Sequence, residues 1–227
     1  MQQTALNLIA IGVFALTLLS LLGPLLNISP AIPAIATFGI LSIVTLDSLS
    51  WQGKGVTLLL NSLASASPEY RQRIIRHEAG HFLVAYLLNI SITGYVLSAW
   101  EAFRQGQPGQ GGVTFAEPNL TTPVPQIFIQ QYCTVWMAGI AAETLVYGSA
   151  EGGAEDRQKL QGVLASLKRP ASESLQQERF CTLQAKTMIQ EHWAAYEALV
   201  TAMEQRTPVA ECCQLIEQHR IVKSFEF

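Results

Sequence analysis

Charged side chains are scarce in this chain, and its first 46 residues contain none. Only 14% of the 227 residues are Asp, Glu, Lys or Arg, whereas 49% are hydrophobic. The formal net charge is −3, and there is neither a basic block nor a basic stripe interleaved with aromatic residues, which argues against a nucleic-acid partner. The composition is too apolar for an ordinary soluble domain, and the chain is too long to be a membrane anchor alone. We therefore expect a membrane segment joined to one domain.

Cysteine is also sparse, and its spacing excludes the common cysteine-based frameworks. The four cysteines are Cys133, Cys181, Cys212 and Cys213, and no two of them form a CxxC pair. A disulfide between the adjacent Cys212 and Cys213 would be strained. We therefore expect free thiols in a reducing compartment.

Two long uncharged runs stand near the amino terminus. Residues 5–26 form a run of 22 residues, enough to cross the hydrocarbon core at about 1.5 Å per residue. A cleaved signal peptide is the alternative, but it requires a positive charge before a shorter run. Residues 31–46 are only 16 in number, so a tilted span, a re-entrant segment and a soluble hydrophobic helix all stay open. We predict a hairpin of two membrane helices.

The distribution of positive charge predicts the orientation. The first basic residues, Lys54, Arg71, Arg73 and Arg76, all follow the second apolar run. This asymmetry places the carboxy-terminal part on the cytoplasmic or stromal side of a lipid bilayer. We expect a membrane anchor at residues 1–50, a linker or interfacial segment at 51–67, and a folded domain at 68–227.

The strongest chemical signal is the motif His77-Glu78-Ala79-Gly80-His81. Residues four apart on an α-helix share one face about 6 Å apart along the axis, so both imidazoles can reach one metal ion. Two histidines and a carboxylate leave a fourth position on zinc for water, whose pKa zinc lowers to about 7. Glu78 is placed to take the proton of that water. The motif therefore predicts metal-assisted hydrolysis of a peptide bond.

The alternative is that both histidines are ordinary helix residues. The flanking sequence favours the metal interpretation, because Ser67-Pro68-Glu69 is a typical helix start and residues 82–88 are mostly apolar. A third ligand must come from elsewhere. The downstream candidates are the carboxylates Glu143, Glu151, Glu155 and Asp156.

Three segments in order carry a resemblance to a known family. The motif HEAGH is followed here by AGIAAETLVYG at residues 138–148 and by GGAEDRQKL at 152–160. The peptidase domain of FtsH-type membrane metalloproteases has HEAGH, then a segment like GRAAEELVFG, then one like GASNDLQ. The chain resembles this domain over residues 68–218. The resemblance implies zinc ligands His77, His81 and Asp156, with Glu78 as the general base and Glu143 as a carboxylate that orients a ligating histidine.

The sequence departs from that family in two respects. No GxxxxGK(S/T) phosphate loop is present, and the 53 residues before Lys54 are too few for an ATPase module, so the chain looks like an FtsH-type peptidase domain without its AAA ATPase. Arg76 directly precedes the motif, and a cation beside a ligand could weaken metal binding.

The fold class expected for residues 68–227 is mainly α, with an FtsH-peptidase-like helical zinc domain that includes a small β-hairpin or sheet. Residues 92–99 and 112–117 have the composition of short strands around a loop at 104–112. These strands would either accept an extended peptide at an edge or only cover the core. Helices are expected at 125–147, 156–167, 174–193, 194–205 and 209–218. His192 and His219 have no partner at ligand spacing, so we interpret them as surface or packing residues.

Three functions are compatible with these features. The first is a membrane-anchored zinc metalloendopeptidase that cleaves unfolded or damaged polypeptides without ATP. The second is a non-proteolytic membrane scaffold or regulator that partners full-length FtsH-type proteases or forms homo-oligomers. The third, an intramembrane protease, is disfavoured because an LDG-like segment is absent and because Arg71, Arg73 and Arg76 would be costly in lipid.

Overall fold

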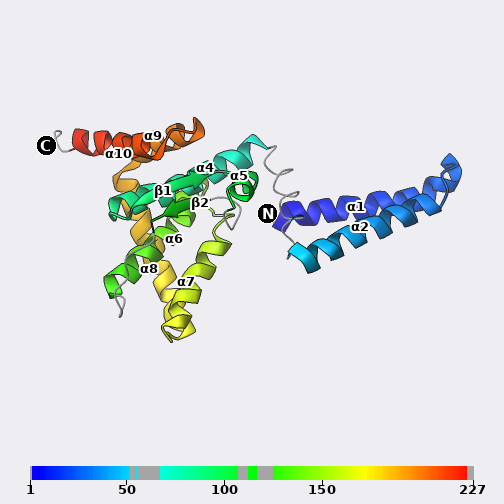
Figure 1. Cartoon of the computed structure of the whole chain (residues 1–227), viewed down its shortest axis with the longest axis horizontal. Helices are drawn as coiled ribbons and strands as arrows, with labels where there is room; N and C mark the ends of the chain where they lie inside the picture. The colour runs from blue at the N-terminus through cyan, green and yellow to red at the C-terminus, as the bar shows by residue number, and fades with distance from the viewer. Residues whose placement is uncertain (1, 52–54, 56–66, 107–111, 117–124, 224–227) are drawn as a thin grey trace. The chain divides into compact units, whose positions relative to one another are not determined.

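The computed structural model describes residues 2–51, 55, 67–106, 112–116 and 125–223 (Figure 1). The chain divides into two compact units at the junction of Ser67 and Pro68, and each unit is described by itself. The described residues contain nine α-helices, a short 3₁₀ helix and one two-stranded antiparallel sheet. The prediction of a mainly helical chain with a small sheet is therefore confirmed at this level. The linker predicted at 51–67 and the loop predicted at 104–112 lie largely outside the described residues.

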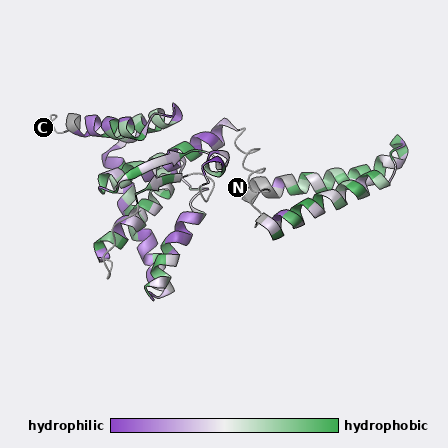
Figure 2. Ribbon diagram, viewed as in Figure 1, coloured by the Kyte–Doolittle hydropathy of each residue, from purple (hydrophilic) through white to green (hydrophobic). Residues whose placement is uncertain are grey.

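The first unit consists of two long apolar helices. Helix α1 (Gln2–Leu22) continues into the 3₁₀ helix η1 (Gly23–Leu26), and α2 (Ala31–Trp51) returns after a turn. Asn27 makes the turn in a left-handed conformation, with φ 55°. Figure 2 shows hydrophobic residues along both helices, and the windows Ile9–Leu26 and Ala31–Ser50 are long and apolar enough to cross a membrane.

Helix α2 extends further than its uncharged run predicted. It passes through Asp47 and ends only at Trp51, so it has 21 residues rather than 16. The Asp47 carboxylate accepts a hydrogen bond from the backbone N–H of Gly55 at 2.9 Å, which gives the charge a partner near the end of the helix. The objection that the second run is too short for a crossing therefore does not hold.

The second unit is a helical domain built around α4. Its elements are α4 (Pro68–Leu87), β1 (Ile92–Val96), α5 (Ala99–Arg104), β2 (Gly112–Phe115), α6 (Gln126–Tyr147), α7 (Ala154–Ser166), α8 (Ala171–Glu191), α9 (Trp193–Glu204) and α10 (Val209–Lys223). Helix α4 packs on α6 and α9, α6 packs on α8, and α9 packs on α10. The two strands pair in the register Tyr95↔Val113 and lie against α4.

Helix α5 was not predicted: Ala99 was assigned to a strand, Arg104 to a loop, and residues 100–103 to no element. The Ser98 side chain accepts a hydrogen bond from the backbone N–H of Glu101, and the Glu101 carboxylate accepts one from the backbone N–H of Leu97. This reciprocal arrangement satisfies free N–H groups at the start of the helix. Strand β1 consequently ends at Val96 rather than at residue 99.

Small residues let α4 and α6 approach closely. A Cβ atom on Gly80 would lie 2.6 Å from the carbonyl oxygen of Ala138 and 2.7 Å from Cβ of Ala142. The buried residues Phe82 and Leu83 continue the core on the same helix. This close packing holds the motif-bearing face of α4 against α6.

Candidate metal centre

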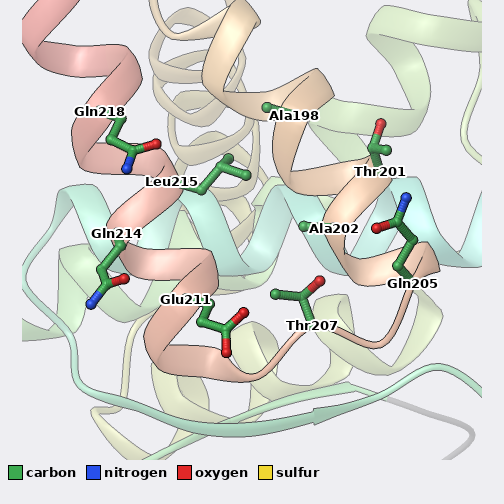
Figure 3. Close-up of a pocket in the computed structure, with 9 residues that line it drawn as sticks. All are labelled: Ala198, Thr201, Ala202, Gln205, Thr207, Glu211, Gln214, Leu215 and Gln218. Atoms are coloured by element: carbon green, nitrogen blue, oxygen red, sulfur yellow. The ribbon is translucent and has the colours of Figure 1, made fainter.

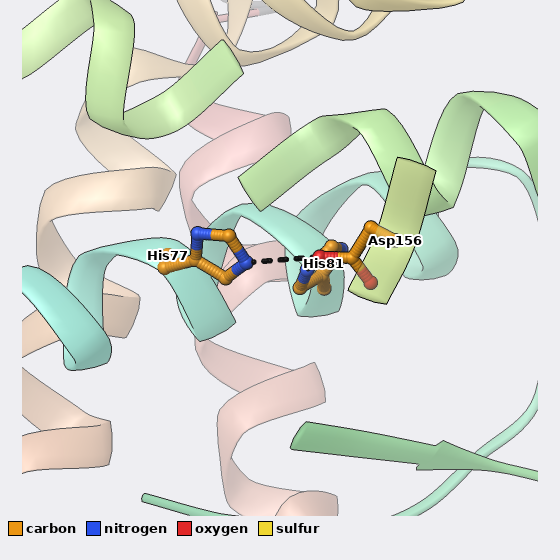
Figure 4. Close-up of side chains that lie close together, drawn as sticks. All are labelled: His77, His81 and Asp156. Atoms are coloured by element: carbon orange, nitrogen blue, oxygen red, sulfur yellow. Dashed lines mark hydrogen bonds and ion pairs between the residues drawn. The ribbon is translucent and has the colours of Figure 1, made fainter. Parts of the chain in front are cut away.

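The structure brings His77 and His81 of α4 together with Asp156 of α7. One ligand atom from each residue lies within 4.8 Å of the others (Figure 4). The distances to Asp156 Oδ2 are 3.2 Å from His77 Nε2 and 3.5 Å from His81 Nε2. All three residues are buried, with exposed fractions of 8%, 6% and 8% in chain order. This group can hold a metal ion.

The outward nitrogen of each imidazole has its own acceptor. His77 Nδ1 lies 2.7 Å from Glu143 Oε1, and His81 Nδ1 lies 2.7 Å from the backbone carbonyl oxygen of Val135. An acceptor at Nδ1 keeps the proton there and leaves the lone pair of Nε2 for a cation. The other oxygen of Asp156 pairs with Lys159 Nζ at 3.4 Å. Each member of this set of two imidazoles and one carboxylate is thus held from behind, which is typical of the ligands of a metal ion.

The charges of the cluster favour a cation between its members. Burial alone would lower the pKa of His77, but hydrogen bonds with Asp156 and Glu143 raise it to about 10. Burial would raise the pKa of Asp156, but the charge of His81 and the hydrogen bond with His77 outweigh it and hold that pKa well below its usual range. Positive charge is therefore stabilised at His77, and the Asp156 carboxylate stays ionised.

Glu143 is the most heavily hydrogen-bonded side chain of the site. Its Oε1 accepts from Gly152 N–H at 3.1 Å, and its Oε2 accepts from Glu151 N–H and from Arg73 Nη1, both at 2.9 Å. Burial opposes ionisation, but the hydrogen bonds from His77, from the Glu151 backbone and from Arg73 lower the pKa of Glu143 to about 2. Glu143 is thus an ionised carboxylate behind His77, the position that the resemblance implied.

Glu78 differs from the other carboxylates of the site. Its residue is 7% exposed, and among the described residues its Oε2 has no hydrogen-bond partner. Burial raises the pKa of Glu78, and the positive charges of His81 and His77 oppose that shift. A carboxylate with a raised pKa and an unpaired oxygen is suited to accept a proton.

The remaining candidates lie elsewhere. Glu155 is exposed, and Glu151 points its carboxylate to Arg73 at 3.3 Å. Arg76 directs its guanidinium to Glu197, with Nη1–Oε1 and Nη2–Oε2 distances of 2.7 and 3.2 Å. His192, which lies between α8 and α9, hydrogen-bonds to the Met188 carbonyl oxygen of α8, and His219 hydrogen-bonds to the Leu215 carbonyl oxygen of its own helix α10.

Four contributors to the site were not recognised from the sequence: the Val135 carbonyl oxygen, Gly139, Gly152 and Arg73. A backbone carbonyl such as that of Val135 leaves no signature in the sequence. Gly139 lies under the His77 ring, and a Cβ atom on Gly152 would approach Glu143 Oε1 to 2.6 Å and His77 Nδ1 to 3.1 Å. Both glycines lie in the segments that carried the resemblance, but only the packing shows that the His77 ring requires the space. Arg73 pairs with Glu143 and Glu151.

A separate groove lies between α9 and α10 (Figure 3). Alanine, threonine and glutamine dominate its lining, and among its described lining residues only Glu211 is ionisable. The described residues that could hold a metal ion are His77, His81 and Asp156 instead.

Comparison with protein-family models gives no match, and comparison with curated proteins gives none.

Proposed function

We propose that the protein is a membrane-anchored zinc metalloendopeptidase. The observation that carries this proposal is the convergence of His77, His81 and Asp156 in a buried site beside Glu78, whose Oε2 lacks a partner among the described residues. The order of the three segments that resemble the FtsH-type peptidase domain supports the same activity. The two apolar helices of the first unit support anchoring in a membrane, with the second unit on the cytoplasmic or stromal side.

His77, His81 and Asp156 would hold the metal through Nε2, Nε2 and Oδ2. Zinc supplies an activated water near neutral pH and polarises the scissile carbonyl. Glu78 accepts the proton of the attacking water and returns it to the leaving amine. Glu143 and the Val135 carbonyl keep the two rings in place during these steps.

The substrate class follows from the missing phosphate loop. Without a nucleotide site, the chain has no means of its own to unfold a substrate with ATP. The substrates are therefore unfolded or damaged polypeptides, and cleavage is independent of ATP.

The test uses the purified full-length chain in detergent, with its zinc content measured first. Cleavage of an unfolded polypeptide such as casein should be equal with and without ATP. Glu78→Gln should keep the zinc and reduce the rate by roughly 100- to 10,000-fold, because it removes proton transfer without removing a ligand. ATP-stimulated turnover by this chain alone would contradict the proposal. Zinc-loaded protein that cleaves no unfolded substrate would instead support a scaffold or regulator of FtsH-type proteases.

A further inference from the structure

Arg73 lies one helical turn before His77 and contacts four groups around the metal centre. Its Nη1 donates to Glu143 Oε2 at 2.9 Å and to the Ser149 carbonyl oxygen at 3.2 Å. Its Nη2 pairs with Glu151 Oε1 at 3.3 Å, and its Cζ lies 4.2 Å from the centre of the Tyr147 ring. The guanidinium thus joins α4 to the end of α6 and to the connection that leads to α7.

We propose that Arg73 is a positioning residue of the metal centre, which orients His77 through Glu143 and places Asp156 through the connection at residues 149–152. This role rests on the proposed metal site and adds to it a residue outside the HEAGH motif.

The first part of the argument concerns the Glu143 carboxylate. Both of its oxygens are used: Oε1 by His77 and Gly152 N–H, and Oε2 by Arg73 and Glu151 N–H. The Glu143 side chain is only 2% exposed, and Arg73 pairs with Oε2, the oxygen that does not face His77. A buried carboxylate that loses an ion-pair partner is costly, so it relaxes by rotating toward water. This rotation alters the hydrogen bond that orients His77.

The second part concerns the path of the chain to the third ligand. Ser149, Glu151 and Gly152 are tied to Arg73 or Glu143, and α7 begins at Ala154 immediately afterwards. Gly153 turns the chain in a left-handed conformation, with φ 85°, and its position against Ile140 has no room for a Cβ atom. Asp156 therefore stands one turn beyond a connection whose backbone is fixed by the same two side chains that orient His77.

Arg76 provides a matched comparison on the same helix. Its guanidinium forms a bidentate ion pair with Glu197, whereas that of Arg73 pairs with two carboxylates. The two side chains are similarly exposed, at 21% for Arg76 and 20% for Arg73. Tyr196 donates to its backbone oxygen at 3.0 Å. Arg76 thus links α4 to α9, whereas Arg73 links α4 to the residues that build the metal centre.

The experiment measures zinc affinity of the full-length protein by competition with a chromophoric chelator, and records the visible absorption of the cobalt-substituted protein. Arg73→Gln should weaken zinc binding by about 10- to 100-fold and change the cobalt spectrum, because the outer partners of a ligand control its geometry. The zinc affinity of Arg73→Lys should lie between those of wild type and Arg73→Gln, since lysine keeps the charge but loses the several N–H donors of the guanidinium. Arg76→Gln should change the affinity by less than about threefold. Equal affinities for Arg73→Gln and Arg76→Gln would overturn the proposal.

A double-mutant cycle distinguishes an effect of Arg73 through Glu143 from a general loss of folding. Thermal unfolding of each variant in the presence of a chelator monitors folding directly. If Arg73 acts through Glu143, then Arg73→Gln added to Glu143→Gln should weaken binding little further. Fully additive losses would overturn the role. Wild-type protein that binds no zinc would overturn this inference together with the metal site. Zinc-binding protein without protease activity would remove only the proposed function, because the readout is affinity.

Discussion

His77 and His81 are held by different kinds of partner, and this difference has consequences at the scale of single residues. Glu143 is an ionised side chain that can be substituted, whereas the Val135 oxygen belongs to the backbone and cannot be removed by mutation. Asp156 in turn approaches the Nε2 atoms of both rings. The three carboxylates around the motif therefore have different environments. Under the proposed function, Asp156 would be a ligand, Glu143 an orienting group and Glu78 a proton acceptor.

The ligand role of Asp156 can be distinguished from that of Glu143 by zinc titration. Asp156→Ala should abolish stoichiometric zinc binding, since it removes one of three protein ligands. Glu143→Ala should retain zinc with an affinity about 10- to 100-fold lower, because outer partners have smaller effects. The assignment is wrong if Glu143→Ala empties the site while Asp156→Ala remains loaded.

The acid stability of the chelated protein should depend on Glu143. Its pKa is lowered from 4.5 to about 2 in the folded protein, so its contribution to stability is complete above about pH 4.5 and is lost as the pH falls toward 2. A shift of this size corresponds to a few kcal/mol, at about 1.4 kcal/mol per unit. Thermal unfolding in the presence of a chelator, measured from pH 6 downward, should show a steeper decline for wild type than for Glu143→Gln. Identical slopes would contradict this assignment.

At the scale of elements, the crossing of α4 and α6 determines the geometry of the site. The crossing is close because Gly80 faces Ala138 and Ala142, and it brings Gly139 under the His77 ring. Glu143 lies on the same helix as Gly139 and reaches the outward nitrogen of that ring. One helix pair therefore provides both histidines, the space they occupy and both Nδ1 acceptors.

Gly80→Ala should destabilise the domain by about 1–3 kcal/mol, because the added methyl group meets the Ala138 backbone oxygen and cannot move away without shifting a helix. Gly162→Ala is the control. Gly162 lies inside α7 with open space around its Cβ position, so this substitution should stabilise the protein by about 0.5–1 kcal/mol. Thermal or denaturant unfolding of both variants measures the difference. A Gly80 variant as stable as the Gly162 variant would show that the helices can separate at no cost.

At the scale of the whole molecule, a strongly apolar unit is joined to a domain with a buried polar site. Helices α1 and α2 expose large side chains such as Phe14 and Phe38, with exposed fractions of 67% and 75%. Exposure of this kind is unfavourable in water and favourable in lipid. The first unit is therefore compatible with a lipid environment, whereas the second unit buries apolar side chains in a core of its own.

The orientation of this arrangement can be tested by protease protection. In sealed vesicles with the cytoplasmic face outward, added protease should digest the part of the chain after Lys54 and spare α1 and α2, because every Lys and Arg follows the second helix. Opening the vesicles with detergent provides the control for access. Full protection of residues 68–227 in intact vesicles would contradict the orientation.

Local features of the chain were predictable because they depend on neighbours in the sequence. The four-residue spacing of His77 and His81 places them on one face of any helix, and Pro68 is suited to the first turn of α4, where the helix begins. The apolar runs identified the two long helices, although Asp47 concealed the true end of α2. Helix α5 was missed because its reciprocal capping by Ser98 and Glu101 is a weak signal in a segment of only six residues.

The sequence by itself determined the metal-binding face of α4, the apolar unit and the helical character of the domain, since helix periodicity and hydropathy are local properties. From the residues alone, four carboxylates competed for the third ligand, and only the resemblance favoured Asp156. The tertiary structure decided that Asp156 meets His77 from 79 positions away, that the Val135 carbonyl holds His81, and that Arg73 pairs with Glu143. Such contacts depend on how closely α4, α6 and α7 pack, and that packing arises from side-chain volumes and backbone approach across the whole domain.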